Sequence, residues 1–477
     1  MSNLCPLYID GEWVTGDGEP FDVIDPATEA VVGSVPTATD DELDRALAAA
    51  DKGFRTWSAT PGWTRAETLD AIAAATRARA GELAALLTAE QGKPIGEATG
   101  EVASAADYFT WFADEARRVY GRVIPGRTPE RRMMVLREPV GPVAAFTPNN
   151  FPWLLPARKI AAALAAGCSV VLKPAEDTPL SAGRLAAICA EVGLPPGVLN
   201  VVTGDPVGIS RRLVGSPVIR KVSLTGSVAV GKQILHLTAD SVKRVSLELG
   251  GHAPVVVLPG SDPVEAAAGL VQSKFRNCGQ VCVSPSRAFV DASVYDDVVD
   301  EIGRATRKLV IGAGSDPNTD IGPLVSARRI DAVERMVDDA RSKGATVVAG
   351  GARAEGHDTG FYYQPTVLTD VDRSMSVLVD EPFGPILPVL RYEDVADAIA
   401  EANSLDVGLA GYVHGPDLLL ADRVARGLDV GIVGVNTYAL AFAEAPFGGV
   451  RESGYGSEGG AEGIEEYLSV RYLNVPC

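Results

Sequence analysis

The sequence predicts an α/β protein with two α/β domains and a smaller β element, and three observations lead to this prediction. The chain has 477 residues, and single hydrophobic cores rarely grow beyond about 250–300 residues, so two or more packed units are expected. Short apolar segments alternate with helical patterns between residues 140 and 250 and again after Pro254, which indicates parallel sheets covered on both faces. Residues 122–138 are strand-like but interrupted by Pro125, Gly126 and Pro129, which indicates either a projecting hairpin or a plain surface loop.

The N-terminal part predicts short strands followed by scaffold helices. Residues 7–35 have the pattern of short strands and turns. Thr39 or Asp40 can then begin a helix, because apolar residues follow at helical spacing and either side chain can cap the first turn. Two further helical patterns, at about 64–90 and 95–117, carry alanine-rich stripes that are typical of core faces.

The two alternating runs predict the central elements. In the first run the strands are expected at 143–146, 169–173, 198–202, 218–224 and 242–249, and the helices at 154–166, 181–192 and 228–237. In the second run the strands are expected at 255–258, 287–290, 346–349 and 388–390, and the helices at 293–309, 326–343 and 394–402. Ligands bind such sheets at the carboxyl ends of the strands, so the functional residues are sought there.

These patterns define the expected domain boundaries. The first α/β domain is expected to comprise residues 1–120 and 139–250 and to resume near 436–460, where the glycine-rich stretch 447–460 predicts a loop. The second α/β domain is expected at 251–435. Residues 121–138 and 461–477 form the β element, in which the β-like stretch 467–475 is expected to pair with another subunit.

Composition and charge narrow the functional classes. The net charge of -19 repels phosphate backbones, so we expect no nucleic-acid partner. No stretch is apolar over the roughly 20 residues that a membrane helix needs, so we expect no membrane partner. Six cysteines in so long a chain do not indicate a disulfide scaffold, and a reducing, cytoplasmic location is expected. Cys278 and Cys282 lack a second Cys/His pair at ligand spacing, so no metal is expected.

The stretch 275–285 contains the residue that we select as a nucleophile. Cys282 lies four residues after Cys278, among Gly279, Gln280 and Ser284. A cysteine becomes reactive as its thiolate, and we interpret Cys282 as the group that attacks a carbonyl carbon. The alternative is a small buried hydrophobic residue, which is the ordinary role of a free cysteine.

Four stretches in order resemble the NAD(P)-dependent aldehyde dehydrogenases. They are Pro148-Asn149-Asn150-Phe151-Pro152, Leu247-Glu248-Leu249-Gly250-Gly251, the Gly-Gln-x-Cys core that ends at Cys282, and Glu381-Pro382-Phe383-Gly384-Pro385. The resemblance extends over nearly the whole chain. It implies a Rossmann-like cofactor domain, a second α/β catalytic domain, and an oligomerisation role for the β element in a homodimer or homotetramer.

The resemblance implies a set of catalytic roles. Cys282 would add to the aldehyde, while the Asn150 amide and the backbone N–H of Cys282 would stabilise the resulting oxyanion. Glu248, at the end of an apolar strand, would activate the water that hydrolyses the thioester. Simple turn chemistry at Asn150 and a salt bridge at Glu248 are the alternatives. Asn149 departs from the residue, often Trp, that usually precedes the oxyanion asparagine, and this change could alter the pocket.

The resemblance also implies a cofactor site. Lys173 and Glu176 follow a buried strand and match positions that hold the adenosine ribose hydroxyls. A glutamate there repels a 2′-phosphate, so NAD is favoured, with NADP possible. Gly226 and Ser227 lie between a strand and a helix whose N-terminus can bind pyrophosphate. Glu381 and Phe383 match residues at the nicotinamide ribose. Ordinary surface or helix-breaking turns are the alternatives.

The substrate is inferred from two arginines. Arg158 and Arg276 match residues that hold the distal carboxylate in succinate-semialdehyde and 2-oxoglutarate-semialdehyde dehydrogenases, so oxidation of succinate semialdehyde to succinate is expected. The loop at 439–444 departs from that group, because it has no serine and contains Phe442. The alternatives are structural arginines with a neutral, aromatic or 2-oxoglutarate-semialdehyde substrate, or a non-catalytic nucleotide-binding relative. A redox partnership of Cys278 with Cys282 is left open.

Overall fold

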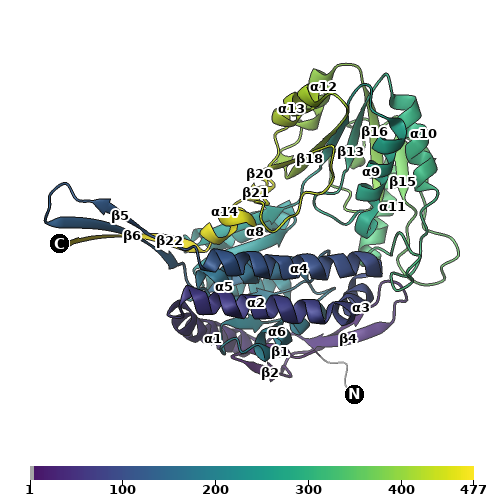
Figure 1. The fold of residues 1–477 in the computed structure, drawn as a ribbon. Coiled ribbons are helices and arrows are strands. Elements are labelled where there is room, and N and C mark those ends of the chain that lie inside the picture. Colours follow the sequence, from purple (N-terminus) through teal and green to yellow (C-terminus); the bar gives the residue numbers. More distant parts are fainter. Residues whose placement is uncertain (1–4, 477) are drawn as a thin grey trace.

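The computed structural model describes residues 5–476 and shows two large sheets flanked by helices, with a slender three-stranded sheet that extends away from them (Figure 1). Both large sheets are mostly parallel, so the α/β prediction is confirmed. No helix among residues 5–476 is long and apolar enough to cross a membrane.

The N-terminal residues form two hairpins, as predicted. The first consists of β1 (Leu7–Ile9) and β2 (Glu12–Val14), and it joins the edge of the first large sheet where Tyr8 faces Val201. The second consists of β3 (Pro20–Ile24) and β4 (Val31–Pro36) and forms a sheet of its own.

Four scaffold helices follow. The first, α1 (Asp40–Ser58), begins with a capping box in which Thr39 and Glu42 satisfy each other's backbone N–H groups. The prediction of a single helix at 64–90 is wrong, because this stretch forms two helices, α2 (Gly62–Ala78) and α3 (Ala80–Gln91), that meet at Arg79. Gly81, in the first turn of α3, is the only glycine or proline near this break, which lets α2 and α3 both pack against α4 (Ile95–Ala116).

The first large sheet has the order β2-β1-β9-β8-β7-β10-β11-β21. Its parallel strands are β7 (Val143–Phe146), β8 (Val170–Lys173), β9 (Leu199–Val201), β10 (Lys221–Gly226) and β11 (Arg244–Leu249). The helices between them are α5 (Leu154–Ala166), α6 (Leu180–Glu191), α7 (Pro206–Gly215) and α8 (Val228–Ala239). The chain rejoins this sheet at β21 (Gly454–Tyr455), which runs antiparallel to β11.

The second large sheet has the order β14-β15-β16-β13-β12-β18-β19. Its strands are β12 (Pro254–Val257), β13 (Arg287–Asp291), β14 (Thr346–Ala349), β15 (Thr366–Thr369), β16 (Ile386–Tyr392), β18 (Ala410–His414) and β19 (Ile432–Val435). Its helices are α9 (Pro263–Phe275), α10 (Tyr295–Thr306), α11 (Ala327–Ser342), α12 (Val395–Ala402) and α13 (Leu418–Gly427). The sequence reading missed β15, β18, β19, α9 and α13.

Shorter elements complete the fold. They are two 3-10 helices, η1 (Arg276–Gly279) and η2 (Ser376–Leu378), a small antiparallel pair of β17 (Val407–Gly408) with β20 (Val450–Arg451), and α14 (Gly460–Glu465). Because β20, β21 and α14 follow β19, the C-terminal part of the chain leads from the second sheet back to the first.

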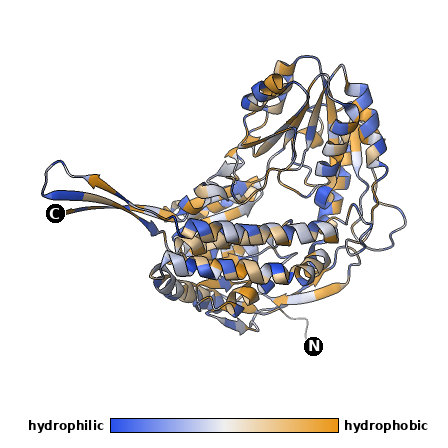
Figure 2. Ribbon diagram, viewed as in Figure 1, coloured by the Kyte–Doolittle hydropathy of each residue, from blue (hydrophilic) through white to orange (hydrophobic). Residues whose placement is uncertain are grey.

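The slender sheet is built from the two segments that the sequence analysis grouped. β5 (Arg122–Pro125) and β6 (Arg131–Pro139) form a hairpin and not a plain surface loop, and β22 (Leu468–Pro476) pairs antiparallel with β6 along its whole length. Figure 2 shows that the hydrophilic start of β6 lies beside the hydrophobic end of β5 at the tip of this arm. The domain boundaries themselves stay a prediction.

Candidate active site

Cys282 lies in a turn shortly after α9, where the backbone takes unusual conformations. Asn277, Cys278 and Gly279 all have positive φ angles, of 48°, 53° and 72°. A Cβ atom at Gly279 would lie 2.2 Å from the backbone oxygen of Gly384, so only glycine lets this turn approach the loop after Glu381. The turn leaves Cys282 partly exposed on the wall of a cavity.

This cavity has a volume of about 680 Å³ and lies at the carboxyl ends of β7, β10 and β11. Cys282, Glu248 and Asn150 all line it, although they are far apart in the sequence. The structure therefore brings the three residues with expected catalytic roles to one site, at the sheet edge where ligands of α/β proteins bind.

The Glu248 side chain is buried, and neither carboxylate oxygen has a hydrogen-bond partner within the protein. Burial and the nearby Glu458 raise the pKa of Glu248 to about 7, while Arg158 and Lys159 act in the opposite direction. Burial and the Glu248 carboxylate also raise the pKa of the Cys282 thiol well above its usual value. At neutral pH the resting site therefore holds a protonated thiol beside a carboxyl group that can exchange protons.

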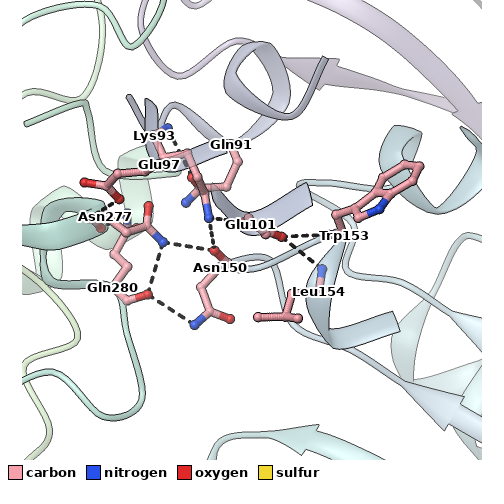
Figure 3. Close-up of polar contacts among 9 residues, drawn as sticks. All are labelled: Gln91, Lys93, Glu97, Glu101, Asn150, Trp153, Leu154, Asn277 and Gln280. Carbon is pink, nitrogen blue, oxygen red and sulfur yellow. Dashed lines mark hydrogen bonds and ion pairs between the residues drawn. The ribbon is translucent and has the colours of Figure 1, made fainter. Parts of the chain in front are cut away.

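The Asn150 side chain is buried in the turn between β7 and α5 (Figure 3). Its Nδ2 donates a hydrogen bond to the backbone oxygen of Gln280 at 3.1 Å, and its Oδ1 has no partner. An amide nitrogen carries two hydrogens, so this bond orients the group and leaves one N–H free for a ligand in the cavity.

The β10–α8 connection offers backbone donors to the same cavity. Ser227 caps α8 by accepting from the N–H of Val230, so the N–H groups of Val228 and Ala229 have no partner inside the helix. Gly226, Ser227, Val228 and Ala229 all line the cavity. A helix N-terminus with free N–H groups suits the pyrophosphate of a dinucleotide, so the residues present fit such a cofactor.

Glu381 and Phe383 line the opposite part of the cavity. A Cβ atom on Gly250 would lie 2.3 Å from a carboxylate oxygen of Glu381, so the absent side chain makes room for this carboxylate. Burial and the nearby Glu248 raise the pKa of Glu381 to about 8. Phe383 has a positive φ of 40°, and the Arg329 guanidinium lies 5.9 Å from the centre of its ring.

Lys173 and Glu176 lie at the carboxyl end of β8 and form an ion pair. Burial lowers the pKa of Lys173 to about 8, although Asp177 and Asp205 oppose the shift. Neither Lys173 nor Glu176 is among the residues that line the cavity with Cys282.

The two arginines have different surroundings, and neither lines the cavity. Arg158 is buried on α5 between the rings of Tyr108 and Phe447, at 4.8 and 4.5 Å from their centres, and its Nε has no partner. Arg276 is exposed at the end of α9, 5.3 Å from the centre of the Phe151 ring. The expected pairing of both arginines at one pocket wall stays a prediction.

The sequence reading missed a buried polar network behind Asn150 (Figure 3). The Nζ of Lys93 contacts the backbone oxygen of Asn150 at 2.7 Å and a Glu101 carboxylate oxygen at 2.5 Å. A signal was present in the sequence, because Lys93, Glu97 and Glu101 recur every four residues in an otherwise apolar helical stretch. Residues 5–476 contain no cluster of side chains able to hold a metal ion.

Comparison with known proteins identifies the chain. Residues 13–473 match the aldehyde dehydrogenase family. The chain is 43% identical to glutarate-semialdehyde dehydrogenase of Pseudomonas putida and 43% identical to the NADP(+) succinate-semialdehyde dehydrogenase of Escherichia coli, in both cases over 98% of this chain and 96% of the relative. The crystal structure of succinate-semialdehyde dehydrogenase from Burkholderia pseudomallei is 42% identical and superimposes with a TM-score of 0.96, covering 99% of this chain and 98% of that one. The chain belongs to the aldehyde dehydrogenase family. It is an NAD(P)-dependent aldehyde dehydrogenase, and the expectation of an enzyme of this family is confirmed.

Proposed function

We propose that this enzyme oxidises succinate semialdehyde to succinate, with Cys282 as nucleophile and NAD as the preferred cofactor. The convergence of Cys282, Glu248 and Asn150 on one cavity supports this proposal. Two relatives, a glutarate-semialdehyde and a succinate-semialdehyde dehydrogenase, add to it, because both of these semialdehydes carry a carboxylate remote from the aldehyde.

The first chemical step is addition of the Cys282 sulfur to the aldehyde carbon. The thiol proton passes to Glu248, whose raised pKa suits it to accept a proton near neutrality. As the S–C bond forms, negative charge develops on the aldehyde oxygen. The free N–H of the Asn150 amide and the backbone N–H of Cys282 stabilise this charge.

The second step oxidises the adduct, and the third releases the product. Bound NAD would supply the hydride acceptor for this oxidation, after which Cys282 would carry a thioester. Glu248 releases to solvent the proton that it accepted in the first step, and it then takes a proton from water, whose oxygen attacks the thioester carbon. The C–S bond breaks, the carboxylic acid leaves, and the proton on Glu248 passes to the sulfur, which restores the Cys282 thiol.

The cofactor would be held by both α/β units. The α8 N-terminus with Gly226 and Ser227 would hold the pyrophosphate, and Glu381 and Phe383 would hold the nicotinamide ribose. Lys173 and Glu176 would hold the adenosine ribose, where the Glu176 carboxylate and the nearby Asp205 oppose the 2′-phosphate of NADP. In this arrangement residues 1–120 and 139–250 form the cofactor domain and 251–435 the catalytic domain.

The distal carboxylate of the substrate would be held by Arg158, with Arg276 at the entrance. Burial of the Arg158 guanidinium with no partner for its Nε lowers the stability of the folded protein, unless an anion accepts a hydrogen bond from it. The aromatic rings on both sides hold the guanidinium plane in place. The aromatic and neutral aldehydes of the alternative hypothesis would leave this group unsatisfied.

Replacement of Arg158 by methionine tests the substrate assignment. The variant should raise the KM for succinate semialdehyde by roughly ten- to a hundred-fold, because a charged hydrogen bond is worth about 1.5–3 kcal/mol. The KM for butanal, which has no carboxylate, serves as the matched control and should change little. An unchanged KM for succinate semialdehyde would refute the carboxylate role of Arg158.

A further inference from the structure

A set of charged side chains behind the cavity has no role in the steps above. Lys93 and Glu101 are fully buried, and Glu97 lies between them in the sequence at four-residue spacing. Each of the three contacts the backbone of a segment that carries an expected catalytic residue, as Figure 3 shows. The start of α4 thus contacts the Asn150 turn and the Cys282 turn together.

On the side of the first sheet, the pair Lys93–Glu101 contacts the backbone of the Asn150 turn at Asn150 itself and where the turn enters α5. Lys93 Nζ donates to the backbone oxygen of Asn150 at 2.7 Å. Glu101 accepts from the backbone N–H groups of Trp153 and Leu154 at 2.8 and 3.1 Å, at the start of α5. A buried charge pair therefore sets the backbone from Asn150 to the start of α5, in the turn that presents the Asn150 amide.

On the side of the nucleophile, the same backbone oxygen of Asn150 accepts a second hydrogen bond. The Asn277 Nδ2 donates to it at 2.9 Å, and the Asn277 backbone N–H donates to Glu97 at 2.9 Å. Gln280, two residues before Cys282, accepts from the Asn150 Nδ2. Asn150 is thereby tied to the cysteine turn through both its main chain and its side chain.

Stability alone is a poor reason for this arrangement. A buried ion pair is often no better for stability than apolar residues of similar volume, because the desolvation of two charges offsets their attraction. Burial lowers the pKa of Lys93, while Glu101 opposes the shift and favours the charged form. The pair does orient the backbone of the Asn150 turn, because the Lys93 ammonium donates to one carbonyl and the Glu101 carboxylate accepts from two N–H groups.

We propose that Lys93 is a positioning residue for the oxyanion site, and that it acts through Asn150. By fixing the Asn150 carbonyl relative to the cysteine turn, it holds the free amide N–H where the aldehyde oxygen becomes negative. Glu101 supports this role by pairing with the ammonium. The inference rests on the oxyanion role proposed for Asn150.

The test is a double-mutant cycle between Lys93 and Asn150. The substitution pair Lys93→Met/Glu101→Gln removes the cation without leaving Glu101 as an unpaired carboxylate, while Glu97 keeps the Asn277 N–H as its donor. It is made in the wild-type and in the Asn150→Ala backgrounds. Hydrolysis of p-nitrophenyl acetate is followed, because acyl transfer to Cys282 forms an oxyanion without hydride transfer or a substrate carboxylate, so the result is independent of the proposed aldehyde.

In the wild-type background the pair should lower kcat by roughly ten- to a hundred-fold with little change in KM, because misplaced transition-state donors act on kcat. In the Asn150→Ala background it should have no further effect, since the group through which Lys93 acts is gone. Lys93→Gln/Glu101→Gln, which restores a donor to the Asn150 carbonyl, should recover part of the rate.

Lys221→Met is the matched control, because Lys221 is an equally buried lysine at the start of β10, remote from the cavity lining. Its kcat should stay near that of the wild type, and thermal unfolding checks that every variant is folded. An equal loss of kcat in both backgrounds would overturn the proposal. Wild-type activity in Asn150→Ala itself would refute the oxyanion role of Asn150, and the role of Lys93 with it.

Discussion

Glu248 shows how the surroundings of one residue set its chemistry. A glutamate on the surface titrates at about pH 4.3 and is a weak base. At the end of β11 the same side chain is buried and has no hydrogen-bond donor, and its pKa rises to about 7. The rise results mainly from desolvation, with Glu458 as the next contribution, so the basicity depends on water being kept away from the carboxylate.

The raised pKa of Glu248 predicts the pH dependence of turnover. In the proposed mechanism the carboxylate form of Glu248 is the base, so thioester hydrolysis should fall as pH decreases through about 7 and level off above it. Glu248→Gln removes the base that accepts the thiol proton and activates water, so it should slow the first burst of NADH and lower steady-state turnover by about 10²–10⁴-fold. The measurement is rapid-mixing kinetics across pH with the wild type and this variant. A Glu248→Gln variant that keeps the wild-type steady-state rate would refute the assignment of Glu248 as the base.

At the scale of elements, the packing of the strand–turn–helix unit β10–α8 depends on a close contact between Gly231 of α8 and Leu249 of β11. A Cβ atom at Gly231 would lie 2.5 Å from the Cδ1 atom of Leu249, so the glycine lets the first turn of α8 pack against β11. This packing sets the direction of the α8 N-terminus, whose free N–H groups line the cavity.

Replacement of Gly231 by valine should therefore weaken cofactor binding more than it affects chemistry. The larger side chain must displace α8 or Leu249, so the KM for NAD should rise by at least about tenfold, while kcat at saturating NAD stays within about threefold. Initial rates at varied NAD check this, with Ala229→Gly in the same turn as a control that adds no bulk. An unchanged KM for NAD would contradict the claim that the packing of Gly231 against Leu249 sets the position of the α8 N-terminus.

The elements also show what could be read from the sequence. The strands of the first sheet and the cysteine turn carried clear patterns, because apolar strands and glycine-dependent turns have local signatures. The break at Arg79 had only the weak signal of Gly81, because an isolated glycine is tolerated within a helix. The strands β15, β18 and β19 depend on packing between distant segments and had no clear signal. The contact of Lys93 with Asn150 crosses 57 positions of sequence and could not be predicted from spacing alone.

At the scale of the whole molecule, the slender sheet has an unpaired edge. β22 is an edge strand, and Val470 and Tyr472 on one of its faces are 62% and 55% exposed. An edge strand with exposed apolar side chains favours pairing with another chain, and we propose a second copy of this enzyme as the partner, in a homodimer or homotetramer.

The proposed assembly predicts a solution mass that is a multiple of 49.8 kDa. Val470→Asp/Tyr472→Asp should lower the mass measured by light scattering toward that of one chain, because buried carboxylates oppose association. Arg471→Gln, on the other face of β22, is the control and should leave the mass unchanged. A wild-type mass of 49.8 kDa would contradict the assembly.

Whole-molecule architecture places the candidate site between the two large sheets, with Glu248 contributed by one and Cys282 and Glu381 by segments around the other. The central claim is that this cavity oxidises a carboxylate-bearing aldehyde with NAD. The most direct test is the initial rate of NADH or NADPH formation with succinate semialdehyde, glutarate semialdehyde, propanal and benzaldehyde, compared as kcat/KM. The account predicts that succinate semialdehyde with NAD has the highest value, and that Cys282→Ala abolishes it. Equal or higher values for propanal and benzaldehyde, or turnover that survives in Cys282→Ala, would contradict it.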